Sequence, residues 1–448
     1  MLRLLKYVNN IRALQAFQLI RTGALFLISI IFTKKNPFTG EYFLPTGEIG
    51  IYETFLIIAG FVSFFWISGM LQSLLSVYNN NKAFSSKDKN PVFFNIFILF
   101  TLLGIIAAVF VWVLETPISR IIGGLSGGKI PYMKILFMYI VLSCPVNLIE
   151  YIYLLKNKPL MIIWYGSITF TLQVICVICP LLLGYDLGYG LYGLVFVNII
   201  RFIWLVFIVY KYSQLEFSAA FLKEFIKLSM PLILSILIGG SASYIDSFLV
   251  SYKFDEATLA IFRYGTKELP FVSLLTIAFS NAMTPRFSDP ANIKRPLLEL
   301  RKGGTRLMHY IFPATLLIIL TSKYLYPVIF NPNFADSAVL FNISNLLIII
   351  RFIFVTTILI GLKDTKIIFS ASILELTVNV ILSIILIDFM GINGVAIATI
   401  IAYVINKIYL IYYLRKKHNI RLSQYLDLKV YYFYVACLFV CFFVSFIL

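Results

Sequence analysis

The chain has 448 residues, of which 60% are hydrophobic and 13% charged, and its mean hydropathy is +0.93. A soluble protein of this composition would expose a large apolar surface to water, so the composition excludes the soluble globular class and indicates a protein embedded in lipid. The formal net charge of +17 does not indicate nucleic-acid binding, because the sequence contains no polar module that would present a basic face.

Apolar stretches of about 20 residues, long enough to cross the hydrocarbon core of a membrane, recur along the whole chain. In the first half we expect spans at residues 13–32, 49–71, 94–114, 135–155, 160–183 and 191–210. After the polar residues 211–227, we expect spans at 230–250, 259–283, 307–325, 339–361, 367–387 and 395–414. The sequence therefore predicts an all-α polytopic membrane protein with two six-helix lobes, 1–212 and 213–422, and an additional hydrophobic helix in 423–448.

The positions of the basic residues predict the orientation of the spans. If the N-terminus is cytoplasmic, the larger share of Lys and Arg falls in cytoplasmic loops, as the positive-inside rule requires. Two basic clusters, at 286–306 and 415–421, would then both face the cytoplasm. The first apolar run ends at Phe32 without a small-residue cleavage site, so we expect a retained span rather than a removed signal peptide.

A short pattern repeats about 200 residues apart. Gly190 and Gly193 open the sixth span, Gly391 and Gly394 open the twelfth, and each pair precedes an apolar run that ends in Lys or Arg. Because each half would contain an even number of spans, the two halves would run parallel. That pseudo-symmetry is typical of transporters that move two lobes around a cavity at the membrane midplane.

Ionisable residues inside the spans are candidates for function, because each costs about 2.5 to 3.5 kcal/mol at the bilayer centre. We interpret Arg21 in the first span as a cavity cation that binds phosphate, against the alternative of a structural ion pair. Asp246 in the seventh span is predicted either to pair with Arg21 between the lobes or to bind a coupling ion. Glu150 and Glu375 are candidates for the same coupling or interface role.

Other charged residues lie nearer the ends of the predicted spans. Arg263 and Lys267 are four residues apart and would share one helix face, as a second phosphate contact or as side chains that extend to the membrane surface. Glu53 occupies a comparable place in the first half and is a further candidate for the substrate cavity. The remaining charged side chains are expected to extend to the membrane surface, and they are Arg201, Arg351 and Lys407.

The sequence argues against an enzyme, a metal site or a bound cofactor. Cys176 and Cys179 form a CxxC pair inside an apolar run, with no further ligands at the spacing of a zinc site. No nucleophile constellation or phosphate-binding glycine loop appears. The longest loops between spans, 33–48 and 115–134, are short and contain few acids, whereas a membrane glycosyltransferase or polymerase would need a sizeable loop with carboxylates.

Several motifs in order resemble the polysaccharide-exporter branch of the multidrug/oligosaccharidyl-lipid/polysaccharide (MOP) superfamily, which includes O-antigen and capsule repeat-unit flippases. The motifs are GEIGIY at 47–52, LSMPLILS at 228–235, YIDSFLV at 244–250, LAIFRY at 259–264, MTPRFS at 283–288 and GINGVAIAT at 391–399. The resemblance covers nearly the whole chain. One departure is the run 430–448, because related chains have twelve or fourteen spans and a thirteenth would place the C-terminus outside.

The resemblance implies a flippase of the bacterial cytoplasmic (inner) membrane. It would move an undecaprenyl-pyrophosphate-linked oligosaccharide repeat unit by alternating access, coupled to protons or sodium. Arg21, Arg263 and Lys267 match positions where the family carries cavity cations. The implied partners are membrane lipids, a polysaccharide polymerase and a chain-length regulator. The alternative is a cation-coupled multidrug exporter of the same fold, which should prefer an acidic cavity.

Overall fold

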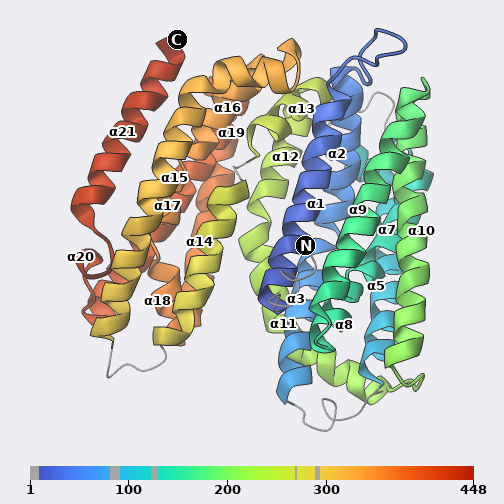
Figure 1. Ribbon diagram of the computed structural model, residues 1–448, viewed down its shortest axis with the longest axis horizontal. Coiled ribbons are helices and arrows are strands. Elements are labelled where there is room, and N and C mark those ends of the chain that lie inside the picture. Colours follow the sequence, from blue (N-terminus) through green and yellow to red (C-terminus); the bar gives the residue numbers. More distant parts are fainter. Residues whose placement is uncertain (1–9, 81–90, 123–128, 268–269, 288–292, 448) are drawn as a thin grey trace. The chain divides into compact units, whose positions relative to one another are not determined.

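The computed structural model describes residues 10–80, 91–122, 129–267, 270–287 and 293–447 (Figure 1). Within these ranges the regular elements are helices, with one isolated β-bridge between Lys35 and Tyr42. Nine helices are long and apolar enough to cross a membrane, or up to eleven if each bent pair counts as one span, over the part of the chain that is described. The prediction of an all-α polytopic membrane protein is confirmed.

The chain divides into two compact units. The N-terminal unit comprises Met1–Gly240 and Ser251–Ala257, and the C-terminal unit comprises Ser241–Val250 and Thr258–Leu448. Two helices, α12 (Ala242–Lys253) and α13 (Glu256–Gly265), contribute residues to both units.

The N-terminal unit is a bundle in which long helices pack in pairs, α1 with α9, α3 with α11, and α5 with α7 (Figure 1). Its helices are α1 (Asn10–Phe32), α2 (Thr46–Phe61), α3 (Phe64–Asn80), α5 (Val92–Val113), α6 (Glu115–Ile121), α7 (Met133–Val146), α8 (Leu148–Leu155), α9 (Pro159–Leu182), α10 (Leu187–Tyr212) and α11 (Ala219–Gly240). Small residues allow the close approaches. A Cβ atom at Gly193 would lie 2.1 Å from the carbonyl oxygen of Cys176, so α9 and α10 touch backbone to backbone.

The C-terminal unit packs α15 against α16 and α21, and α16 and α18 against α19 (Figure 1). Its further elements are α14 (Pro270–Met283), η2 (Thr284–Phe287), α15 (Lys294–Ile329), η4 (Pro332–Phe334), α16 (Ala335–Asn345), α17 (Ile348–Arg351), α18 (Val355–Gly361), α19 (Thr365–His418), α20 (Leu422–Tyr425) and α21 (Leu428–Ile447). Buried Phe287, Phe312 and Phe352 belong to its core. The terminal run is therefore a helix packed on α15, which the sequence had left without a neighbour.

Several spans differ from the predicted ones in where they begin and break. The second span bends by 46° between α2 and α3, and the seventh bends by 45° between α11 and α12. The polar stretch 211–227 is not all loop, because α11 begins at Ala219. The predicted spans 367–387 and 395–414 join in α19, whose direction changes at Gly391 with a positive φ of 58°. Positive φ is accessible to glycine because it lacks a Cβ atom.

The two ends of α19 are tied together outside the membrane-spanning segment. Asp364, which precedes α19, accepts hydrogen bonds from Lys417 (Nζ to Oδ2, 2.7 Å) and Tyr413 (3.0 Å), and the Nε2 atom of His418 lies 3.0 Å from the same oxygen. The hydrogen bond from Lys417 is the main cause that lowers the pKa of Asp364 to about 2. We call the parts of α19 before and after Gly391 its first and second arms. The fold thus holds the start of the first arm beside the end of the second arm.

Candidate functional site

A buried polar cluster lies inside the N-terminal unit, centred on Arg201 of α10. The side chain of Arg201 is 9% exposed, and its Nη2 donates to Oε1 of Gln173 over 2.9 Å. Its guanidinium carbon lies 4.6 Å from the ring centroid of Phe170, a cation–π contact. The Nε atom of Arg201 has no hydrogen-bond partner among the described residues. The prediction that Arg201 extends to the membrane surface is wrong, because α9 supplies both a ring and an amide that hold the guanidinium inside.

Glu150 and Arg21 belong to the same cluster. Glu150, in α8, is 7% exposed, and the charges of Arg21 and Arg201 both act on it. Arg21 lies on α1 with an exposed side chain, and within the described part of the N-terminal unit it forms no hydrogen bond or close ion pair. Arg21 therefore does not form a direct ion pair with Glu150, although a structural ion pair was the alternative role considered for Arg21. An exposed guanidinium is available to a ligand, whereas Glu150 balances charge in the interior.

Glu53, predicted as a cavity residue, is buried in α2 at 3% exposed. It neighbours Tyr52, whose ring packs edge-on against that of Phe32 on α1. A carboxylate this deep does not face open solvent in the N-terminal unit. Its assignment to a substrate cavity stays a prediction.

In the C-terminal unit, Asp246 of α12 sits in a pocket of oxygen atoms. It is 4% exposed, and its carboxylate accepts hydrogen bonds from Thr399 (Oγ1 to Oδ2, 2.7 Å) and Ser383 (Oγ to Oδ1, 3.2 Å). Asn379 donates to Oγ1 of Thr399 over 3.0 Å, while its own Oδ1 is buried without a partner among the described residues. No described Lys or Arg of this unit forms an ion pair with Asp246. The pairing with Arg21 would join the two units and stays a prediction.

The glycine pattern noted in the sequence builds this pocket. Gly391 changes the direction of α19, and a Cβ atom at Gly394 would lie 2.2 Å from the carbonyl oxygen of Leu386, so the two arms of α19 touch. This contact brings Asn379 on the first arm within hydrogen-bond distance of Thr399 on the second. Carboxylate, hydroxyl and amide oxygens are the ligands that hard cations prefer. The Asp246 pocket therefore suits a small cation or a proton.

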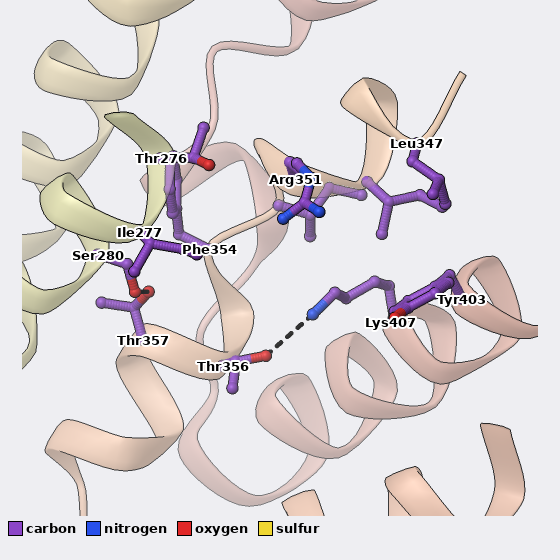
Figure 2. Close-up of a pocket in the computed structure, with 12 residues that line it drawn as sticks. Thr276, Ile277, Ser280, Leu347, Arg351, Phe354, Thr356, Thr357, Tyr403 and Lys407 are labelled. Atoms are coloured by element: carbon purple, nitrogen blue, oxygen red, sulfur yellow. Dashed lines mark hydrogen bonds between the residues drawn. The ribbon is translucent and has the colours of Figure 1, made fainter. Parts of the chain in front are cut away.

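A cavity of about 190 Å³ lies in the C-terminal unit between α14, α17, α18 and α19 (Figure 2). Figure 2 shows Arg351 and Lys407 pointing into the same space from α17 and α19. The Nζ of Lys407 donates to Oγ1 of Thr356 over 3.0 Å, and the hydroxyls of Ser280 and Thr357 are 2.7 Å apart on the opposite wall. The chain is interrupted between α17 and α18, and irregular backbone at membrane depth is tolerated where it lines a cavity.

The prediction that Arg351 and Lys407 extend to the membrane surface is wrong for both residues. The charges of Arg351 and Glu375 act on Lys407, which shows that the three groups are neighbours. Glu375 nevertheless forms no direct ion pair with Lys407 among the described residues. The sequence missed this cavity because its lining comes from four helices.

Arg263 and Lys267 do not share a helix face. Helix α13 ends at Gly265, and Lys267 follows it outside the helix, with its Nζ 4.1 Å from the ring centroid of Tyr264. The predicted continuous span 259–283 is broken after Gly265, and α14 begins at Pro270, because proline is tolerated in the first turn of a helix and not in its interior. Arg263 is half-buried in the last turn of α13. The premise of a joint i, i+4 phosphate contact is therefore wrong, and each residue's role stays a prediction.

Sequence comparison identifies one family. The family model described as lipid II flippase MurJ matches residues 51–448. No curated protein matches the chain in sequence.

Solved structures share the fold at low identity. A lipid II flippase MurJ in an inward closed conformation is 17% identical with a TM-score of 0.65, covering 96% of this chain and 97% of that one. A multidrug-resistance MATE family transporter of the MOP superfamily, in an inward-facing conformation, is 13% identical with a TM-score of 0.58, covering 91% and 94%. A MOP superfamily transporter from Pyrococcus furiosus is 12% identical with a TM-score of 0.55, covering 92% and 97%.

These matches confirm the MOP superfamily predicted from the sequence motifs and a multi-pass protein of the bacterial inner membrane. They also refine the prediction, because the family model that matches belongs to a different branch from the polysaccharide exporters.

Proposed function

The chain belongs to the lipid II flippase MurJ family, and from this membership we propose that it carries lipid II, the lipid-linked precursor of peptidoglycan, across the cytoplasmic membrane. The observation that supports the proposal most is the match over residues 51–448, which covers most of the chain. The chain is a transporter of a lipid-linked substrate and not an enzyme.

The charges of the N-terminal unit suit such a substrate. A lipid-linked glycan precursor carries a pyrophosphate, and a planar guanidinium binds phosphate oxygens through two parallel hydrogen bonds. Arg21 is exposed on α1, and its charge and that of Arg201 both act on one acid, the buried Glu150. In our proposal Arg21 contacts the pyrophosphate, and Arg201 keeps the surrounding helices in place through Gln173 and Phe170.

The C-terminal unit supplies the energy coupling in this proposal. Asp246 is a buried carboxylate surrounded by oxygen atoms, and such a group is stable when it binds a proton or a cation. Because the pocket joins α12 to both arms of α19, binding there would stabilise one arrangement of these helices over another. Proton or sodium binding would then drive the alternating access of the two lobes, with the N-terminus in the cytoplasm.

A second candidate substrate is an O-antigen or capsule repeat unit, favoured by the motifs at 47–52 and 391–399. It shares the undecaprenyl pyrophosphate and differs in its sugars. This substrate would also imply a polysaccharide polymerase and a chain-length regulator as partners.

The test is a host strain in which the gene is depleted. We expect lipid II to accumulate on the cytoplasmic side, wild type to restore growth, and Arg21→Ala to fail while Arg21→Lys restores part of the activity. Gln18→Ala, an exposed neighbour on α1, is the matched control and should complement fully. Accumulation of a polysaccharide repeat unit with normal lipid II pools would instead support the second candidate. Unchanged pools of both lipids would contradict the flippase proposal.

A further inference from the structure

The basic cluster at 415–421 forms a pocket at the C-terminal end of α19, apart from the cavity around Lys407. The pocket has a volume of about 380 Å³, and the side chains that line it are Tyr412, Arg415, Lys416, Asn419 and Arg421. All of these residues are exposed. Three of them are cations and none is an acid, so the pocket presents three positive charges to a ligand.

Two acids near the end of α19 already bind other bases. Asp364 pairs with Lys417 over 2.7 Å, and Asp427 pairs with Arg301 over 2.8 Å. The three cations of the pocket form no ion pair with any residue that the structure describes. Their charge is therefore available to an anion from outside the protein.

The backbone forms this pocket without a ligand. After the last turn of α19, Asn419 has a positive φ of 53°, and the chain turns so that Arg421 lines the same pocket as Arg415. The side chains of Ile420 and Tyr425 are buried in the core of the C-terminal unit and hold the turn in place. A ligand would not have to order the backbone, which reduces the entropic cost of binding.

A track of exposed apolar side chains leads along α19 to the pocket. Its members are three or four residues apart and therefore share one helix face, and they are Ile401, Val404, Ile408 and Tyr412. At 1.5 Å per residue the track is about 16 Å long, about half of the roughly 30 Å hydrocarbon core of a membrane. An acyl chain of one leaflet would fit along the track while its head group lies at the pocket.

We propose that this pocket binds the phosphodiester head group of an anionic membrane phospholipid. Arg415 and Arg421 each present a planar guanidinium, which binds phosphate oxygens through paired hydrogen bonds. Basic pockets between membrane helices bind lipid head groups by the same chemistry. The positive-inside rule explains why bases gather beyond a span, but not why three of them line one pocket at the end of an apolar track.

A phospholipid explains both parts of the surface, the cations and the apolar track. A soluble phosphate would contact the cations alone. The lipid in this inference is a bound component of the surrounding membrane and not the transported substrate, so the inference goes beyond the proposed function.

The experiment measures binding to the purified full-length protein in a non-ionic detergent by native mass spectrometry. The probes are phosphatidylglycerol, phosphatidylcholine with the same acyl chains and no net charge, and soluble glycerol 3-phosphate. We expect wild type to bind phosphatidylglycerol about tenfold more tightly than phosphatidylcholine, or better. The triple variant Arg415→Gln, Lys416→Gln and Arg421→Gln should lose about fivefold in this affinity for each cation, about a hundredfold in all. Arg421→Gln alone should lose about fivefold, and phosphatidylcholine binding should not change.

A matched control separates the pocket from the general surface charge. Lys294→Gln, Lys302→Gln and Arg306→Gln together remove three charges from exposed positions on α15, and this variant should bind phosphatidylglycerol like wild type. Both triple variants change only exposed side chains, and their elution volumes and melting temperatures verify that they are folded.

Three results would each overturn the proposal. They are wild-type affinity for phosphatidylglycerol in the pocket variants, an equal loss in the control variant, and glycerol 3-phosphate binding as tight as that of phosphatidylglycerol. A wild type that does not prefer phosphatidylglycerol would overturn it as well. None of these results would affect the flippase proposal, which is tested by transport.

Discussion

Replacing Asp246 by Asn tests the role of the oxygen pocket in the C-terminal unit. Asparagine has nearly the same shape and keeps an acceptor for Thr399 or Ser383, so the helices should pack as before. What the substitution removes is one negative charge, 4% exposed, that no described cation of this unit pairs with. We therefore expect Asp246→Asn to fold with equal or higher stability while losing its response to the coupling ion.

The magnitude follows from the charge that is lost. Two unit charges about 4 Å apart at an effective dielectric constant of about 20 interact by about 4 kcal/mol, equivalent to roughly a thousandfold in affinity. Part of this energy compensates for the dehydration of the ion, so we expect a loss of at least about tenfold. In wild type, a cation present at about 100 times its Kd would stabilise the folded state by about 2.7 kcal/mol.

The assay is thermal unfolding of purified protein at matched ionic strength in sodium chloride or choline chloride, repeated at several pH values. Wild type should unfold at a higher temperature with sodium, or show a pH dependence that Asp246→Asn lacks. Asp388→Asn, a change of the same kind elsewhere on α19, is the control and should respond like wild type. If wild type and Asp246→Asn respond identically to sodium and to pH, the reasoning about this pocket is refuted.

Three smaller perturbations test the packing and the surface charges. Gly193→Ala would force α9 and α10 apart and should cost about 1 to 3 kcal/mol of stability in a detergent unfolding assay, whereas Gly47→Ala, which meets nothing within 4 Å, should cost little. Arg201→Lys keeps the charge but loses the planar contact, so its melting temperature should fall, by an amount equivalent to about 1 kcal/mol. Because Lys417 lowers the pKa of Asp364 to about 2, below its ordinary value, the stabilisation by Asp364 is present above pH about 4 and is lost as the pH falls toward 2. The melting temperatures of wild type and Asp364→Asn should therefore converge as the pH falls from about 4 to about 2, and a constant difference would contradict this assignment.

Most of the helical framework could be predicted from hydropathy, and the exceptions share one cause. The apolar runs identify α1, α5, α9 and α10 closely, because each of these spans is a single helix with polar residues beyond both ends. The bend between α11 and α12 and the break after α13 were missed, since apolar composition is the same on either side of a bend. A window average records how apolar a segment is and not whether its backbone is continuous.

The candidate sites were predicted unevenly for a similar reason. Asp246 stood out because a lone carboxylate in an apolar run is costly, and the structure surrounds it with oxygen atoms. Lys407 and Arg201 were expected at the surface because they lie within reach of a helix end in sequence. Their true partners, Thr356 and Gln173, come from other helices, and the sequence of one helix contains no information about them.

The most direct test of the flippase proposal is transport by the purified protein in vesicles. The protein is reconstituted with fluorescent lipid II, and a membrane-impermeant quencher reports how much of the label is exposed to the outside over time. The account predicts that lipid II crosses the membrane at a rate that depends on the protein and on an ion gradient, and that Arg21→Ala slows it while Gln18→Ala does not. Folded protein that leaves lipid II on its original side, with or without a gradient of protons or sodium, would contradict the account.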